Sequence, residues 1–169
     1  MSHDVYDLSS FRSTVQHFAR AAQASAGQWT TPRAHGKWSP SQVVEHVAMA
    51  LEQSANDIMG RPTLVLSLPA PLRFVARTLG MNRVVRRGRL FKAKTNSAMN
   101  PGAGPATASE AEARMAVAMD AFAAAVQTAS AQGDTIHSVT FGKVRLADYI
   151  RFQEIHVQHH EEQLPGAAG

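Results

Sequence analysis

The sequence predicts an all-α protein that folds as a four-helix bundle. Four long segments repeat apolar residues at three- and four-residue steps, and stretches rich in glycine, proline and small polar residues separate them. No segment shows the sustained alternation of a long strand. Amphipathic helices bury their apolar stripes against one another, which is the packing of a bundle. A length of 169 residues suits one compact domain, so we expect a single domain over residues 1–169.

The first two helices have recognisable limits. The first is expected over about residues 4–26, where apolar positions recur on one face. The second has the clearest start in the chain. Ser39 is a suitable N-cap, Pro40 suits the first helical position, and Gln42 stands three residues after the cap, as in a capping box. This helix should continue to about Gly60.

Two overlapping capping boxes predict the start of the third long helix. They pair Thr107 with Glu110 and Ser109 with Glu112. The alanine-rich segment that follows would allow close helix packing. After it, an extended connection is expected over residues 137–144, leading into the last helix.

A basic segment of about residues 61–106 lies between the second and third long helices. It contains nine positive residues and no acidic one, whereas the rest of the chain holds the other eight basic residues and all 13 acidic residues. The nine are Arg61, Arg73, Arg77, Arg83, Arg86, Arg87, Arg89, Lys92 and Lys94. The spacing of Leu72, Val75 and Leu79 predicts one or two short helices over residues 72–87. We interpret the segment as a basic helical insertion in the bundle.

The composition excludes several kinds of site. The chain contains no cysteine, so it has no disulfide, no thiolate metal site and no cysteine nucleophile. Any metal must then be held by nitrogen or oxygen ligands. The N-terminal residues lack the basic and apolar regions of a signal peptide, and no apolar stretch is long enough to cross a bilayer. We therefore expect a cytoplasmic protein with no membrane partner.

The last helix, expected over about residues 145–164, carries a pair of histidines. His156 and His160 are four residues apart, so their imidazoles lie on one face and could each reach a shared divalent ion at about 2.0–2.1 Å. His159 points about 60° further round the helix. His46 lies at the edge of the stripe of the second helix, where it would face a groove beside the core. Because a His-x-x-x-His pair also arises by chance among eight histidines, these residues alone leave both a metal site and an incidental pair open.

Three motifs carry a family resemblance. They are Trp-Ser-Pro-Ser-Gln-Val-Val-Glu-His over residues 38–46, Phe-Gly-Lys over residues 141–143, and His-Val-Gln-His-His-Glu-Glu-Gln-Leu over residues 156–164. With these motifs the chain resembles the DinB-like (YfiT-like) superfamily of metalloenzymes. The resemblance implies a bundle that binds one divalent metal through a histidine of the second helix and a His-x-x-x-His pair of the last. By motif position, those ligands correspond to His46, His156 and His160.

A site of three neutral histidines would leave one or more metal positions open, as catalytic sites do. A bound water could supply a hydroxide for hydrolysis, and a bound small thiol could supply a thiolate. Some relatives in the resembling family use a low-molecular-weight thiol, which places thiol-dependent S-transfer to a small-molecule substrate slightly ahead of metal-dependent hydrolysis. Zinc or nickel is the expected metal, with iron and manganese as further candidates.

Residues near the histidine pair are candidates for further roles. Glu161 and His159 are the candidate catalytic residues, and Gln153 and Glu162 could also support the ligands or act on a substrate. For each of them a solvated surface position is an equally good interpretation. Among the residues of the basic insertion, Arg86, Arg87 and Arg89 are candidates for binding an acidic thiol cofactor.

Two rival hypotheses come from different classes of function. Clustered arginines suit phosphate contacts, but the insertion lacks the interleaved aromatic residues of single-strand binders and any known DNA-binding motif, which argues against nucleic acid as a partner. The other rival is a non-catalytic protein whose metal only stabilises the bundle. The family resemblance and the alanine-rich helix surfaces also lead us to expect a homodimer.

Overall fold

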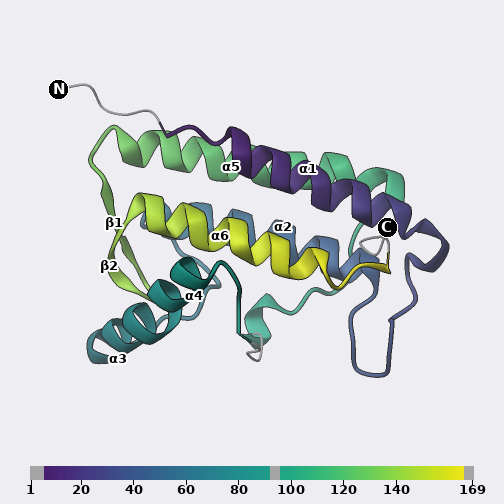
Figure 1. Ribbon diagram of the computed structural model, residues 1–169, viewed down its shortest axis with the longest axis horizontal. Helices are drawn as coiled ribbons and strands as arrows, with labels where there is room; N and C mark the ends of the chain where they lie inside the picture. The colour runs from purple at the N-terminus through teal and green to yellow at the C-terminus, as the bar shows by residue number, and fades with distance from the viewer. Residues whose placement is uncertain (1–5, 92–95, 166–169) are drawn as a thin grey trace.

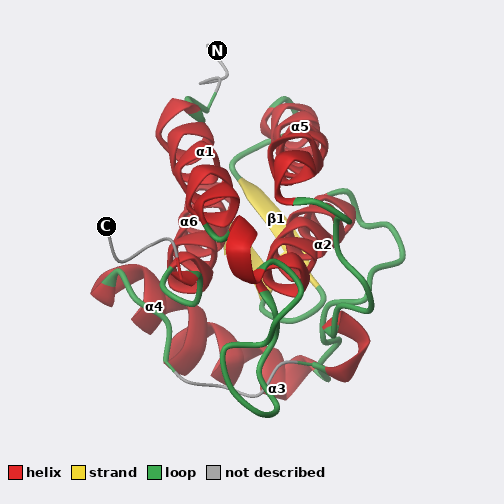
Figure 2. Cartoon of the chain, turned by 90° about the vertical axis from the view of Figure 1, so that its right-hand side faces the viewer, coloured by secondary structure: helices red, strands yellow, loops and turns green. Residues whose placement is uncertain are grey.

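The computed structural model of the protein describes residues 6–91 and 96–165 and confirms the all-α bundle. Its four long helices are α1 (Ser9–Ala24), α2 (Pro40–Ile58), α5 (Ala111–Ser130) and α6 (Leu146–Glu161). Figure 1 shows them in two layers, α1 with α5 above and α6 with α2 below, and Figure 2 shows the same layers end-on. Within the described residues, no helix is long and apolar enough to cross a membrane.

The predicted start of α2 is confirmed. The Ser39 hydroxyl accepts a hydrogen bond from the Gln42 N–H at 3.4 Å, and the Gln42 side-chain oxygen accepts one from the Ser39 N–H at 3.1 Å. Pro40 occupies the first helical position, where its missing N–H costs nothing. This reciprocal pair fixes the register of the helix that carries His46.

Two other predicted starts are wrong. Helix α1 begins at Ser9, later than about residue 4, which lies outside the described residues. The capping boxes expected before α5 do not form, because the hydroxyls of Thr107 and Ser109 bond to each other, 3.0 Å apart, and do not bond to backbone N–H groups. Instead, the Glu110 carboxylate accepts from the Ala106 N–H at 3.0 Å, and a 3-10 turn, η4 (Ala108–Glu110), leads into the helix.

Side chains from all four long helices form one apolar core. Phe11 of α1 meets Phe122 of α5 edge to face, with 5.4 Å between ring centroids. Leu51 of α2 and Leu146 of α6 are fully buried beside them. Burial of each such side chain contributes about 1.5–3 kcal/mol, so these contacts dominate the stability of the bundle.

A short antiparallel hairpin joins α5 to α6 where an extended connection was predicted. Its strands are β1 (Thr135–Ser138) and β2 (Gly142–Arg145). Ile136 lies opposite Val144 in the register, and both are buried, while the strand residues that alternate with them are exposed. The hairpin thus presents one apolar face to the bundle.

The basic insertion forms the helices that its spacing predicts, but it does not bury the predicted stripe. A continuous run of α3 (Ala70–Val75), the π-helical segment η2 (Ala76–Met81) and α4 (Asn82–Arg87) follows α2. Leu72, Val75 and Leu79 are 50%, 46% and 65% exposed. Lys92 and Lys94, counted in the basic segment, lie outside the described residues.

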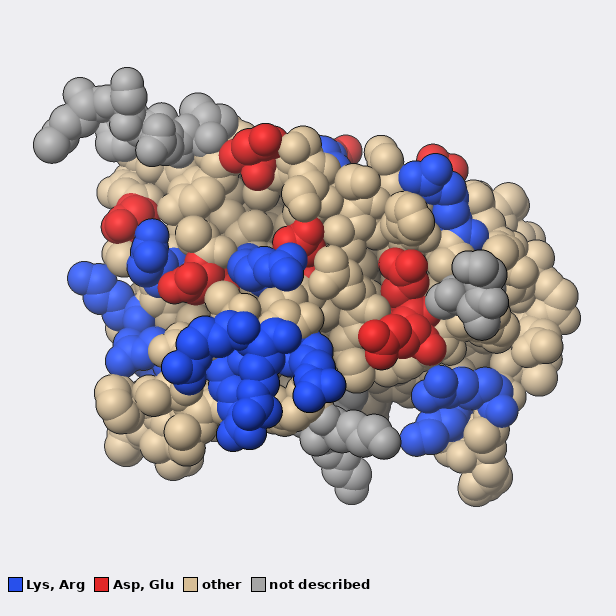
Figure 3. Space-filling model, viewed as in Figure 1, with Lys and Arg blue, Asp and Glu red and all other residues tan. Residues whose placement is uncertain are grey.

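Other side chains attach the insertion to the bundle. The Arg77 guanidinium donates to the Lys143 carbonyl of β2 at 2.7 Å, and the Arg73 Nε donates to the Leu68 carbonyl. Met81 and Val84 are the buried apolar residues of the run. The insertion is thus attached to the bundle through these arginines and through Met81 and Val84, and the apolar side chains of α3 remain exposed to solvent. Figure 3 shows the tan tip of α3 at the lower left, beside blue side chains gathered over α4.

A buried carboxylate connects α2, the hairpin and α6. Asp57, near the end of α2, is 2% exposed. It accepts hydrogen bonds from the Ser138 hydroxyl at 2.7 Å, the Val139 N–H at 2.9 Å and the Tyr149 hydroxyl at 2.8 Å. Burial and the Asp57 charge raise the pKa of Tyr149 well above its usual value, so the phenol remains a donor.

We expect Asp57→Ala to lower the free energy of unfolding by about 3 kcal/mol, because it removes the acceptor of two buried hydroxyls and of one partly buried N–H. Urea denaturation followed by circular dichroism measures the change. Asp120→Ala is the matched control, since Asp120 pairs with Arg12 at 2.8 Å on the surface and such pairs contribute about 0–1 kcal/mol. Equal losses in the two variants would contradict a special role for the buried network.

Candidate metal centre

The structure brings the three predicted histidines together. His46 lies on α2, and His156 and His160 lie on α6, which packs beside it. One nitrogen from each ring falls within 4.8 Å of the other two. The Nε2 atoms of His156 and His160 are 3.1 Å apart, close to the about 3.3 Å expected for two nitrogens that share a tetrahedral zinc ion. The cluster could therefore hold a metal ion.

Hydrogen bonds at two rings leave a nitrogen of each free for a metal. His46 Nδ1 lies 2.9 Å from the Met99 carbonyl oxygen and must donate to it, because a carbonyl only accepts. His160 Nδ1 lies 3.2 Å from Gln163 Oε1, where it donates in the same way. Both rings then keep a lone pair on Nε2, which is how supporting hydrogen bonds select the tautomer of a metal-binding histidine.

His156 is held differently. Its Nδ1 is buried and has no hydrogen-bond partner in the part of the chain that the structure describes. The Nε2 atom is thus the polar atom through which this ring meets the cluster. An enclosed polar atom without a partner is costly and uncommon, so packing and a ligand at Nε2 are what could hold this ring in place.

The surroundings keep all three imidazoles uncharged. Burial lowers the pKa of His46, although the bond to Met99 opposes the shift. Burial, with the charges of the neighbouring histidines, lowers the pKa of His156 well below its usual value. Burial and the nearby His46 lower the pKa of His160 to about 3. A neutral imidazole is the form that binds metal, so the cluster is ready for an ion at pH 7 without losing protons.

His46 is more enclosed than the predicted groove implies, with 3% of its surface exposed. The Trp38 ring packs on it at a centroid distance of 4.6 Å and lies nearly parallel to the His160 ring at 6.2 Å. On its other side, the 3-10 turn η3 (Ser97–Met99) supplies the carbonyl that it binds. Two loops therefore cover a position that helical periodicity alone leaves at an edge.

A cavity of about 960 Å³ opens onto the cluster. The three histidines lie in its lining, together with Trp38 and Gln153. A volume at this upper end of the range for ligand pockets suits a small molecule rather than a lone ion. The cluster is therefore one end of a larger binding space.

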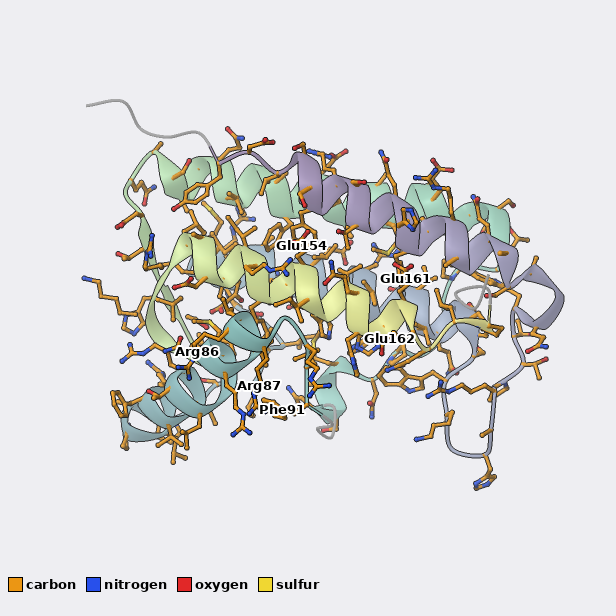
Figure 4. All side chains as sticks on the ribbon, viewed as in Figure 1. Arg86, Arg87, Phe91, Glu154, Glu161 and Glu162 are labelled. Atoms are coloured by element: carbon orange, nitrogen blue, oxygen red, sulfur yellow. The ribbon has the colours of Figure 1, made fainter. Side chains whose placement is uncertain are left out.

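The candidate catalytic residues divide between this cavity and the opposite side of α6. His159 lines the cavity. Glu161 does not, and its carboxylate lies 3.8 Å from His17 Nδ1 of α1, between the two helices, as Figure 4 shows. Glu162 is exposed and is also outside the lining.

The candidate cofactor-binding arginines lie away from the cavity. Arg86 and Arg87 are exposed on α4 (Figure 4), Arg89 is exposed just after it, and none of the three lines the cavity. Among the described residues, the positive ones that line it are Arg33 and Lys37, from the loop between α1 and α2. Both are exposed, which places them at the rim.

A family model described as the DinB superfamily matches residues 10–164, which is nearly the whole chain. The chain belongs to the DinB superfamily. Neither the search of curated proteins nor the search of solved structures gives a significant match. The assignment fits the bundle and its histidine cluster, and it leaves the reaction of this DinB superfamily member open.

Sequence reasoning missed three residues that shape the cluster. Gln163 follows His160 by three positions, a helical spacing that could have indicated their contact. Trp38 stands directly before the capping box of α2, but no pattern shows which ring it covers. The role of Met99 rests on a backbone carbonyl, which carries no sequence signal.

We expect the purified protein to bind about one divalent metal per chain, and His156→Ala to lose it, because two imidazoles hold an ion far less tightly than three. Elemental analysis after dialysis against zinc measures the content. His17→Ala is the control, since its side chain is 72% exposed and lies on α1. Full metal retention in His156→Ala would exclude this cluster as the binding site.

Gly104 lies where the loop from the insertion touches the start of α2. A Cβ added to it would collide with the backbone carbonyl of Ser41. We expect Gly104→Ala to displace this loop, and with it the carbonyl that orients His46, and so to weaken zinc binding about 10-fold or more. Calorimetric zinc titration measures the affinity. Gly102→Ala is the matched control, because a Cβ there meets nothing within 4 Å, and equal affinities in both variants would contradict the role of the loop.

Proposed function

We propose that this DinB superfamily protein is a divalent-metal-dependent enzyme that acts on a small molecule, with thiol-dependent S-transfer ahead of hydrolysis. The observation that carries the proposal is the opening of a neutral three-histidine cluster onto a cavity of about 960 Å³. A metal that serves only the fold is normally enclosed by four protein ligands, whereas a catalytic metal keeps a position open. A structural metal alone has no need of such a space.

Zinc or nickel suits an all-imidazole ligand set, with iron or manganese as further candidates. An ion held by these histidines would lower the pKa of a coordinated thiol or water and so provide a nucleophile at neutral pH. The protein's own groups orient the site. Met99 and Gln163 hold two imidazoles in the required tautomer, and the Trp38 ring shields them from solvent.

The rim of the cavity favours an acidic thiol as the cofactor. The chain has no cysteine, so a thiol nucleophile must come from a small molecule. Arg33 and Lys37 could pair with carboxylates of such a molecule while its sulfur reaches the histidines. The residues proposed to bind the acidic cofactor are therefore Arg33 and Lys37, in the loop before α2, in place of Arg86, Arg87 and Arg89.

Hydrolysis is the alternative, and one placement favours it. His159 lines the same cavity, and its ring centroid lies 5.3 Å from that of His160. An imidazole at this position could act as a general base for water. The same chain could then cleave an ester or amide without a thiol.

To test the proposal, the zinc-loaded protein is incubated with monochlorobimane and a panel of small thiols, and separately with ester and amide substrates. We expect bimane conjugation that requires a thiol and is lost in His46→Ala. Thiol-independent ester cleavage that requires His46 would support hydrolysis instead. Activity that His46→Ala retains, or no activity in either panel despite bound zinc, would overturn the proposal in favour of a non-catalytic metal site.

The acidic-thiol arm of this assay uses glutathione, which carries two carboxylates, against uncharged 2-mercaptoethanol. In Arg33→Ala we expect the KM for glutathione to rise about three- to tenfold, because an exposed charge pair contributes about 1 kcal/mol, and the KM for 2-mercaptoethanol to stay constant. Arg86→Ala is the matched control. A larger rise in the KM for glutathione in Arg86→Ala than in Arg33→Ala would instead indicate that the cofactor binds at α4.

A further inference from the structure

Residues 61–91 of the basic insertion turn an apolar surface, and no charged side chain, towards the cavity. Residues 61–91 contain seven arginines, all within the described part of the chain, and none of them lines the cavity. The side chains from this segment that do line it are all aliphatic or aromatic, apart from the glycine of the π-helical segment. They include Leu66, Leu68, Met81, Leu90 and Phe91. The insertion therefore separates its two kinds of residue, with arginines outside and apolar residues on the cavity wall.

Some side chains of this wall are about half exposed to solvent. Leu66 and Phe91 are each 52% exposed, although both line the cavity. Exposed large apolar side chains that gather in a concave space are typical of ligand sites rather than of free surface. Figure 4 shows Phe91 below α4, at the end of the insertion that faces away from the α1–α5 layer.

The wall continues beyond the insertion. Phe141, in the hairpin turn, and Phe152, on α6, lie edge to face with 5.3 Å between ring centroids, and both line the cavity. The imidazoles and the positive side chains of the lining lie at the histidine cluster and at the rim with Arg33 and Lys37, while neutral polar residues such as Asn96 and Thr140 also line the cavity. The cavity thus has a nitrogen-rich end, a positive rim and an apolar side.

We propose that the apolar side is a second binding compartment, which holds an uncharged alkyl or aryl group of the substrate. This inference rests on the proposed function and extends it. The histidine cluster and rim take the acidic thiol, and the insertion takes the apolar body of the compound that is modified. An uncharged group fits because, among the described residues 61–91, no ionisable side chain lines the cavity to pair with a charge.

The compartment can be tested without catalysis, by fluorescence titration of the full-length protein with the uncharged probe N-phenyl-1-naphthylamine, in zinc-loaded and metal-free forms. We expect saturable binding of one probe per chain in both forms. Phe91→Ala should raise the Kd about fivefold, because it removes a half-exposed aromatic ring from the wall. Phe74→Ala is the matched control, since Phe74 is 61% exposed in the same insertion and does not line the cavity.

A second variant fills the compartment. Gly80 lines the cavity, and a Cβ added there meets nothing within 4 Å, so Gly80→Leu projects into open space and improves helix propensity. We expect it to raise the probe Kd at least about tenfold, a loss of about 1.4 kcal/mol, while zinc content stays constant. Gly27→Leu is the control, because Gly27 also has free space and lies outside the cavity.

The outcomes separate this inference from the proposed reaction. A probe that does not bind, or that binds Phe91→Ala and Phe74→Ala equally, overturns the compartment even where metal-dependent thiol transfer is found. Weaker binding confined to Phe91→Ala and Gly80→Leu upholds it, even where the enzyme assays detect no turnover.

Discussion

The buried Asp57 carboxylate connects the elements on which the candidate site depends. It accepts hydrogen bonds from Ser138, Val139 and Tyr149, and so ties the end of α2 to the hairpin and to the first turn of α6. The histidine cluster is divided between α2 and α6. Nitrogens that must share one ion tolerate errors of only a few tenths of an ångström, so a fixed relation between these two helices is a condition for the site. The shared apolar core holds the helices together, and directional bonds of this kind set how they sit.

Within the site, the constraint is the neutral state and the orientation of the three imidazoles. Each imidazole is surrounded in a way that keeps it neutral, and two of the three also have a hydrogen-bond acceptor at Nδ1. One acceptor, Gln163, follows the end of α6, and the other, the Met99 carbonyl, lies in the last part of the basic insertion. The basic insertion, which follows α2, therefore both covers the histidine cluster and supplies a hydrogen-bond acceptor to it. This arrangement explains how a helix-edge histidine becomes 3% exposed.

The insertion has two faces with different partners. Arg73 of α3 and Arg77 of the π-helical segment bind backbone carbonyls, and the arginines of α4 are exposed. The apolar residues form the cavity wall and an exposed stripe on α3. A purely electrostatic interpretation of the insertion follows from its charge count, but the side chains of residues 61–91 that line the cavity are apolar. Within the part of the chain that the structure describes, the positive side chains that line the cavity belong to the loop before α2, as Arg33 and Lys37.

Features that depend on residues close together in the chain, or on a regular apolar spacing, could be predicted from the amino-acid sequence alone. The capping box at Ser39 and the apolar stripes of the four long helices depend on residues close in the chain, so the bundle and the start of α2 could be predicted. The His-x-x-x-His spacing and the family motifs indicated which histidines would meet. Tertiary structure decided the rest, because it depends on which distant groups come into contact. The pairing of Thr107 with Ser109 removed two predicted capping boxes, and the bond to Met99 enclosed His46. The same reason explains why Arg33 lines the cavity and the predicted Arg86 does not. The sequence shows where arginines cluster along the chain, but only the packed fold determines which of them face a ligand.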